Sequence, residues 1–211
     1  MAFDDFQRDF QRRFDEKMAA REQALPAARR AIRSCANAIR AIHRRETARA
    51  QELMDQAAEA IKEGVEAVRD HPDVAFAGFL QDAMKEYAEA RITEAIVEGS
   101  EIPGPDDVGV QLAPYLNGMA EAIGEARRFI LDLLRTGDVE RGEEVLVAME
   151  DLYYLLVSMD YPDAITGHLR RSTDIARSIM EKTRGDLSLS LVQRDLRDAL
   201  DRHAKVVLGR E

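Results

Sequence analysis

Several features that define common protein classes are missing from this chain of 211 residues. It has a single cysteine, Cys35, so no disulfide can form within the chain. Cys35 shares a helical stripe with Ile32, Ile39 and Ile42, which predicts a buried structural thiol in a reducing cytoplasm rather than a nucleophile. No apolar run approaches the roughly 18 residues of a membrane span, and charge begins at the fourth residue, so we expect neither a membrane segment nor export.

Motifs for most metal and nucleophilic chemistry are missing as well. No histidine follows a glutamate by three residues, which argues against a di-iron site of the ferritin type. No cysteine and histidine cluster suggests zinc, no glycine-rich loop suggests a phosphate site, and no Ser-His-Asp set can be proposed. The net charge of -10 argues against indiscriminate binding to a polyanion, although a net charge hides local patches. Carboxylates are the chemistry that remains.

The residues that are present predict an all-α protein. Tryptophan is absent, prolines number six, and long stretches are rich in Ala, Glu, Arg and Leu, a composition typical of helices. With 45% hydrophobic residues the chain can bury one substantial core, so we expect a single domain over residues 1–211. Breakers and caps divide it into seven expected helices, at residues 3–44, 46–70, 73–98, 107–136, 138–158, 162–184 and 188–206. Their short connections favour an antiparallel bundle.

Two features of these helices allow more than one interpretation. Pro26 lies inside the first segment, where it either kinks one helix or begins a second. Long amphipathic helices in a chain of this size leave apolar faces for further copies, so we expect a homo-oligomer. The stretch Asp151 to Met159, "DLYYLLVSM", is the densest in apolar residues and fits either the core or such an interface.

A basic stripe interrupts this acidic chain. Between residues 27 and 49 there are seven arginines and one acid. On a helical wheel, one face of about 60° carries the arginine stripe, which consists of Arg29, Arg33, Arg40 and Arg44. Guanidinium groups of this kind bind nucleic-acid phosphates without reading sequence, but a solvated face or a set of ion pairs between subunits is the other interpretation. His43 beside the stripe could help to bind phosphate, although a lone histidine is more often a surface or capping residue.

A second basic set occurs near the C-terminus. It is diluted by acids, and we assign it a nucleic-acid contact only together with the stripe. It consists of Arg170, Arg171, Arg177, Lys182 and Arg184, of which we assign Arg170, Arg171 and Arg177 to nucleic-acid binding.

The stretch "KEYAEA", Lys85 to Ala90, places two glutamates beside an apolar helix face. Glu86 and Glu89 border a sector that consists of Phe76, Phe79, Leu80, Ala83, Tyr87 and Ala90. In the expected helix 107–136, Glu121 and Glu125 flank a second apolar sector. If the two helices pack antiparallel, four carboxylates can converge, and an all-oxygen set favours Mg²⁺ or Mn²⁺. Pairing with water or arginine is the other interpretation, because structural ion pairs on helices have the same spacing.

Three stretches together resemble the translin family, and particularly its catalytic branch, translin-associated factor X. They occur in the family's order and spacing over most of the chain and read "KEYAEA", "PYLNGMAEAIGEARRF" and "HLRRSTDIARSIMEKTRGDL". The resemblance implies a seven-helical, all-α fold that assembles into a hollow, roughly octameric shell around RNA or single-stranded DNA. It also implies that acids on the inner wall bind Mg²⁺ and cut RNA endonucleolytically.

The resemblance assigns the acids position by position. Glu86 and Glu89 take the places of two glutamates of that site, Glu121 takes the place of its aspartate, and Glu125 matches a nearby acid. Glu121 is one methylene longer than the aspartate, which would move or weaken a metal but keeps the charge. Translin itself lacks this acidic set, so the glutamates favour the catalytic branch. The arginine stripe resembles, more loosely, the basic first helix that lines the family's cavity.

The sequence therefore predicts an endoribonuclease that depends on Mg²⁺ or Mn²⁺. Its catalytic and metal-binding residues are expected to be Glu86, Glu89, Glu121 and Glu125. A non-catalytic shell that binds RNA or single-stranded DNA through the arginines alone is the alternative. A helical scaffold that binds neither metal nor nucleic acid ranks last.

Overall fold

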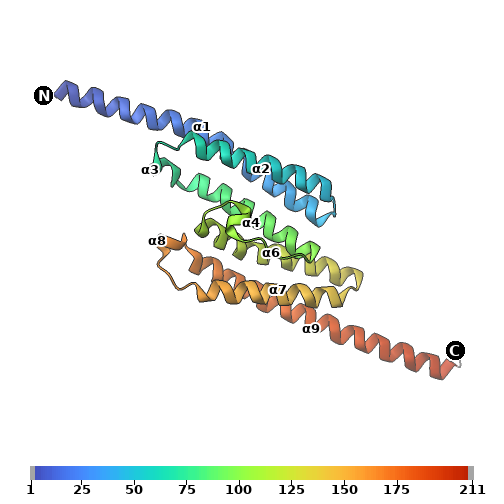
Figure 1. Ribbon diagram of the computed structural model, residues 1–211. Helices are drawn as coiled ribbons and strands as arrows, with labels where there is room; N and C mark the ends of the chain where they lie inside the picture. The colour runs from blue at the N-terminus through green and yellow to red at the C-terminus, as the bar shows by residue number, and fades with distance from the viewer. Residues whose placement is uncertain (1–2, 209–211) are drawn as a thin grey trace.

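The computed structural model describes residues 3–208, and every element within this range is helical (Figure 1). Six long helices carry the fold: α1 (Phe3–His43), α2 (Thr47–Ala67), α4 (Gly78–Glu98), α6 (Leu112–Thr136), α7 (Val139–Ser158) and α9 (Leu169–Leu208). Three single turns lie in the connections: α3 (Pro72–Ala75), α5 (Pro105–Val108) and α8 (Asp163–Thr166). The prediction of an all-α fold is confirmed.

The first long helix is continuous through its proline. Pro26 lies inside α1, and the side of α1 that packs around it buries Ala24, Ala27, Ala28 and Ala31. Small side chains let α2 and α4 approach α1 closely. This packing outweighs the cost of an interior proline, which is about 3 kcal/mol.

The last long helix, α9, is one continuous helix (Leu169–Leu208) where two helices were predicted, at 162–184 and 188–206. Gly185 does not separate two helices but lies inside α9. Leu187, just after it, is buried against α7, where a Cβ added to Gly142 would lie 3.1 Å from Leu187 Cδ1. This packing offsets the roughly 1 kcal/mol that a glycine costs inside a helix.

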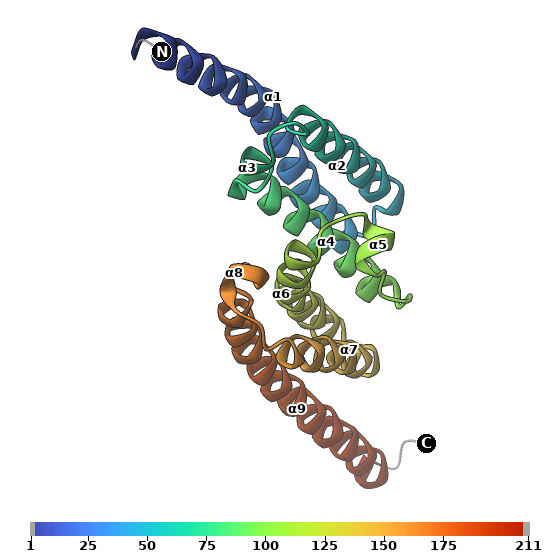
Figure 2. The same cartoon turned by 60° about the vertical axis from the view of Figure 1, so that its left-hand side comes forward.

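Consecutive long helices alternate in direction with one exception (Figures 1 and 2). α4 and α6 run in the same direction, because the connection at residues 99–111 returns along the bundle before α6 begins. Accordingly, Gln81 near the start of α4 bonds at 3.1 Å to Gln111, which immediately precedes α6. The antiparallel packing under which the acids of these two helices were expected to converge is therefore not the packing that is found.

One continuous core runs through the bundle. It draws almost fully buried side chains from five helices, namely Met54, Leu80, Ile92, Ile123, Ile130, Met149 and Leu187. Cys35 on α1 joins this core with no exposed surface, so its predicted burial is confirmed. Phe76, which we expected to share the apolar sector of α4, is 67% exposed because it lies in the turn before that helix.

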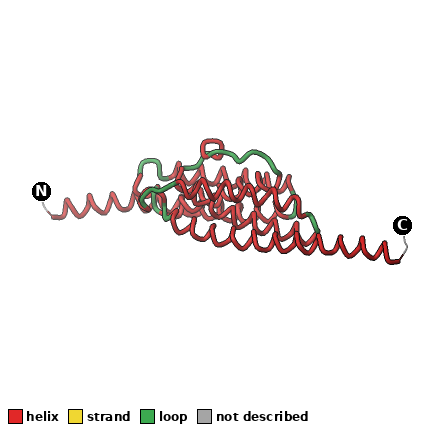
Figure 3. Tube along the Cα trace, turned by 90° about the horizontal axis from the view of Figure 1, so that it is seen from below, coloured by secondary structure: helices red, strands yellow, loops and turns green. Residues whose placement is uncertain are grey.

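Many apolar side chains are exposed outside the core, and some of them lie on two helical arms that extend beyond the bundle at opposite ends (Figures 1 and 3). The N-terminal arm of α1 exposes Phe3, Phe6, Phe10, Phe14 and Met18. The C-terminal arm of α9 exposes Leu189, Val192, Leu196 and Leu200. No helix in the described range is long and apolar enough to cross a membrane.

The stretch Asp151 to Met159 contributes to both kinds of surface. Its buried members are Leu152, Tyr153 and Leu156. Its exposed members are Tyr154, Leu155 and Val157. The core therefore takes one face of this segment of α7 and leaves the other face in solvent.

Candidate metal centre and nucleic-acid interface

The acidic site depends on a close approach of α4 and α6 at Gly118. A Cβ added to Gly118 would lie 2.5 Å from the backbone oxygen of Lys85 and 2.9 Å from the backbone nitrogen of Glu89. Only a residue without a side chain fits at this distance. Because the two helices are parallel and touch here, Glu121, about one turn after Gly118, reaches the level of Glu86 and Glu89.

Three of the four predicted acids converge. Glu86 and Glu89 from α4 and Glu121 from α6 each offer a carboxylate oxygen, and these atoms all lie within 4.8 Å of one another. We call these three residues the carboxylate cluster. It is open on one side, since the side chain of Glu121 is 39% exposed, whereas Glu89 at the inner end is 9% exposed.

Burial and mutual repulsion both disfavour charge at the inner end of the cluster. Desolvation, followed by the charges of Glu121 and Glu86, raises the pKa of Glu89 to about 8. Desolvation also raises the pKa of Glu86, although the positive charge of Lys85 opposes it. Without an added cation, Glu89 is therefore mostly protonated at neutral pH.

Lys85 brings a positive charge into the cluster. Its Nζ lies 2.7 Å from Glu121 Oε1 and 3.6 Å from Glu86 Oε1. Burial works against the charged ammonium, but the hydrogen bond to Glu121 and the charge of that carboxylate outweigh it and raise the pKa of Lys85. The contact joins α4 to α6 across the same gap that the cluster spans.

The fourth predicted acid, Glu125, pairs with a histidine beside the cluster. His43, whose side chain is 4% exposed at the end of α1, donates from Nε2 to Glu125 Oε2 at 2.6 Å. This hydrogen bond outweighs desolvation and, with the charges of His43 and Arg128, lowers the pKa of Glu125. The expectation that His43 is an ordinary surface or capping residue is therefore wrong. The charge of Glu125 still acts on the cluster, because it contributes to the raised pKa of Glu89.

The arginine stripe lies on the solvent side of α1. All four of its arginines are exposed, and within residues 3–208 none of them makes an ion pair, although Arg40 donates to Asn37 Oδ1 at 2.8 Å. Arg30, which lies outside the stripe, instead pairs with Glu63 on α2. On the helical wheel Arg40 is about 60° from His43, which contacts α6. The stripe therefore borders the side of α1 that faces the acidic site.

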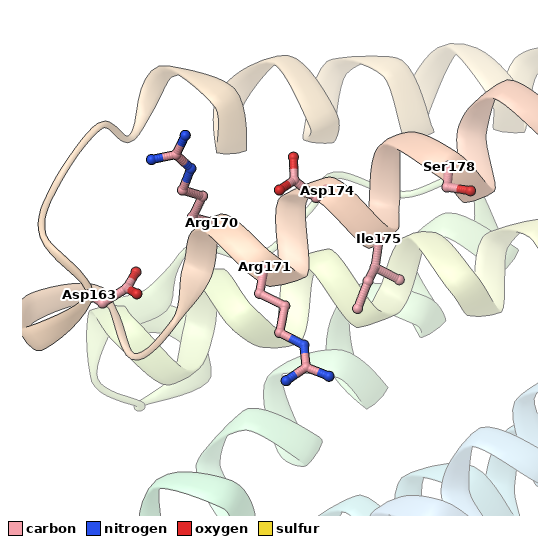
Figure 4. A pocket seen from close by; sticks show the side chains of 6 residues that line it. All are labelled: Asp163, Arg170, Arg171, Asp174, Ile175 and Ser178. Carbon is pink, nitrogen blue, oxygen red and sulfur yellow. The ribbon is translucent and has the colours of Figure 1, made fainter.

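In the second basic set, Arg177 and Arg184 contact α7, whereas Arg170 and Arg171 are exposed. Arg177 donates from Nε to the hydroxyl oxygen of Tyr153 at 2.6 Å and lies over that ring. Arg170 and Arg171 line a surface pocket together with Asp163 and Asp174, and Figure 4 shows the two arginines pointing to different sides of α9. Among the described residues, no contact joins these arginines to the carboxylate cluster.

Comparison with known proteins adds relatives over most of the chain. The uncharacterized protein MJ0175 of Methanocaldococcus jannaschii is 31% identical over 188 residues, which are 88% of this chain and 83% of that protein. A structure of AfC3PO with duplex RNA is 32% identical and has a TM-score of 0.82, with 89% of this chain and 97% of that chain covered. The chain belongs to the translin family. A crystal structure of AfC3PO gives 32% identity and a TM-score of 0.80 over 89% of this chain and 98% of that chain.

The match to other members is looser. Apo-NeC3PO, at 20% identity and a TM-score of 0.74, shares the fold, with 89% of this chain and 96% of that chain covered. No model of a protein family matches the sequence. The similarity of this chain to translin-family proteins is therefore not confined to the three short motifs but covers most of its length.

The roles of three residues at the site of this translin-family protein escaped prediction from the sequence. Lys85 stands next to Glu86 in "KEYAEA", but its partner Glu121 follows only from the pairing of two helices. Gly118 stands in the middle of "PYLNGMAEA", where a glycine inside a helix was a usable signal of close packing. The pairing of His43 with Glu125 carried no local signal, because the two residues lie 82 positions apart in the sequence.

Proposed function

We propose that this translin-family protein binds RNA and cleaves it as a Mg²⁺- or Mn²⁺-dependent endoribonuclease. The proposal is carried by the carboxylate cluster, whose oxygens from two helices lie within 4.8 Å of one another. RNA as the substrate is supported by the likeness to AfC3PO, which has been solved with duplex RNA. In this proposal Glu86, Glu89 and Glu121 hold the metal, and Glu125 is the neighbouring acid that adds negative charge.

The residues of the cluster fit a hard divalent cation. All their donor atoms are carboxylate oxygens, which are the ligands that Mg²⁺ and Mn²⁺ prefer. Glu89 gives the strongest support, since it is 9% exposed and, within residues 3–208, makes no ion pair with a basic side chain. A buried carboxylate among other carboxylates is costly unless it is protonated or neutralised. A divalent cation would remove that cost.

A bound ion would activate a water molecule and stabilise the charge that develops on the scissile phosphate. The protein's own residues would provide the placement. Glu86 and Glu121 offer oxygens from two helices, and the close contact at Gly118 keeps their spacing fixed. Arginines of the stripe would bind backbone phosphates of the RNA strand beside the site.

Glu121 distinguishes this chain from the aspartate that the resemblance implies. Its longer side chain is 39% exposed and already bonded to Lys85. We therefore expect metal binding that is weaker or displaced relative to an aspartate at this position, with the number of carboxylates unchanged.

A homo-oligomer, roughly octameric, is part of the same proposal. The two arms expose a row of apolar side chains that a monomer would leave in water, including Phe3, Phe14 and Leu196. Packing against further copies would bury these rows and could enclose an RNA strand. Binding of single-stranded DNA and a cytoplasmic location stay predictions.

The decisive experiment measures cleavage of a labelled RNA with Mg²⁺, Mn²⁺ or EDTA. Glu86→Gln combined with Glu89→Gln should reduce the rate by at least about 100-fold, because the remaining acid cannot hold the ion alone. Glu98→Gln, which removes an exposed charge at the end of the same helix, is the matched control and should cleave like the wild type. Equal cutting by all proteins in every condition would rule the mechanism out.

The second candidate is a non-catalytic shell that binds RNA or single-stranded DNA through arginines. Lys85 favours it, because the ammonium group already gives the cluster a cation and no metal is then needed for charge balance. RNA binding without metal binding by the wild type would select this candidate.

A further inference from the structure

The ammonium group of Lys85 pairs with carboxylates of the cluster on two helices, α4 and α6. Its Nζ lies 2.7 Å from Glu121 Oε1 and 3.6 Å from Glu86 Oε1. Both of these carboxylates belong to the set whose oxygens lie within 4.8 Å of one another. The ammonium group therefore pairs with two of the three carboxylates that would hold a metal ion.

A metal ion held by Glu121 would lie close to this ammonium group. Mg²⁺ needs oxygens at about 2.1 Å in a nearly octahedral shell. An ammonium group 2.7 Å from Glu121 Oε1 would therefore lie within a few ångströms of a divalent ion bound to either oxygen of that carboxylate. Like charges at that separation repel, and the lysine also takes up a lone pair of the ligand.

The side chain of Lys85 can move out of the cluster into solvent. Its side chain is 24% exposed, and its stem has four flexible carbons. A side chain at the rim can turn toward solvent without rearranging the helix that carries it.

We propose that Lys85 is an internal cation that competes with the divalent ion for Glu121, so that metal binding requires its ammonium group to leave the cluster. This inference rests on the proposed function, because it assigns the cluster to a metal. It makes Lys85 a residue that sets how tightly divalent ions bind. A purely structural salt bridge makes the opposite prediction, since removing it would loosen the cluster and weaken metal binding.

The test measures Mn²⁺ binding by calorimetry on the full-length protein without RNA. Lys85→Met keeps most of the side-chain length and removes the charge, and it should bind Mn²⁺ roughly tenfold tighter than the wild type or better. Lys85→Arg restores a positive charge and should bind within about threefold of the wild type. Lys62→Met removes a lysine whose side chain is 79% exposed on α2 and should change nothing.

A second readout does not depend on calorimetry. Mn²⁺ should raise the melting temperature of Lys85→Met by more than it raises that of the wild type, and Lys85→Gln should behave in the same way if the methionine variant folds poorly. Glu86→Gln should abolish the added stabilisation, which places it at the cluster.

The outcomes separate this inference from the proposed function. Mn²⁺ binding by the wild type that is unchanged or weaker in Lys85→Met overturns the competition and leaves the metal site standing. Binding by Lys85→Met but not by the wild type supports the competition and at the same time counts against metal-dependent cleavage by the wild type. Absence of Mn²⁺ binding by both proteins contradicts both the metal-dependent function and the competition, since there is then no metal site for Lys85 to compete for.

Discussion

Replacing Gly118 with alanine tests the contact that builds the site. The added Cβ would lie 2.5 Å from the backbone oxygen of Lys85 and 2.9 Å from the backbone nitrogen of Glu89. A carbon and an oxygen approach to about 3.3–3.6 Å, so α4 and α6 must separate by about 1 Å. The obstacle is backbone rather than a flexible side chain, so no rotamer change can relieve it, and overpacking of this kind costs about 1–3 kcal/mol.

Gly124→Ala on the same helix is the matched control. A Cβ there meets Ile179 Cδ1 at 3.8 Å, an ordinary contact, so this variant gains only the helix preference of alanine, about 1 kcal/mol. The same gain applies at Gly118, and the difference between the two variants therefore isolates the clash. We expect Gly118→Ala to be about 2 kcal/mol less stable than Gly124→Ala, or about 4–8 °C lower in melting temperature.

Thermal unfolding followed by circular dichroism measures this difference, and Mn²⁺ titration of both variants tests its consequence for the site. Gly118→Ala should bind Mn²⁺ more weakly, because Glu121 moves away from Glu86, whereas Gly124→Ala should bind like the wild type. Equal melting temperatures for the two variants would refute the argument that the backbones touch at Gly118.

Two further predictions concern charge. In the metal-free protein with EDTA, Glu89 has a folded pKa of about 8, above its unfolded value, so the folded state binds the extra proton. The contribution of Glu89 to wild-type stability is therefore lost as pH rises from about 4.5 to 8. Glu89→Gln should lack this part of the fall and be more stable at pH 8 by up to about 4 kcal/mol. Urea unfolding at several pH values measures it, and parallel curves for both proteins would contradict the raised pKa. For RNA binding, measured by titrations at a series of salt concentrations, Arg33→Ala combined with Arg40→Ala should weaken the affinity and flatten its salt dependence by up to about one unit of slope per lost phosphate contact. The control Arg30→Ala removes a guanidinium group already paired with Glu63 and should keep the wild-type slope. An unchanged slope in the double variant would show that the stripe is not part of the interface.

The helices could be predicted from the sequence because their signals are local. Apolar periodicity and caps placed α1, α2 and α7 within about three residues of where they lie. The helices α4 and α6 begin about five residues later than predicted, because α3 and α5 form separate turns before them. The break expected near Gly185 was wrong because a glycine is only a weak local signal, and Leu187 packs against α7 regardless of it. Such a contact between helices α9 and α7 leaves no trace in the periodicity of either helix.

The acids could be predicted for a different reason. Glu86, Glu89 and Glu121 border apolar helix faces. When such a face is buried against a neighbouring helix, the residues that border it lie at the edge of the contact between the two helices. The direction of the two helices was not predictable, since the connection at 99–111 is long enough to return along the bundle and thus to allow either packing. Parallel helices still brought the acids together because Gly118 fixes where they touch.

The sequence alone determined which side chains were available: an all-helical chain, a stripe of arginines and pairs of glutamates beside apolar faces. The tertiary structure alone decided their partners, giving Glu121 the ammonium group of Lys85 and giving Glu125 the imidazole of His43. The physical reason is that helical periodicity is set within a few residues, whereas a charge pair of a few ångströms depends on how two helices lie against each other. Segments tens of residues apart must first be packed before that distance exists.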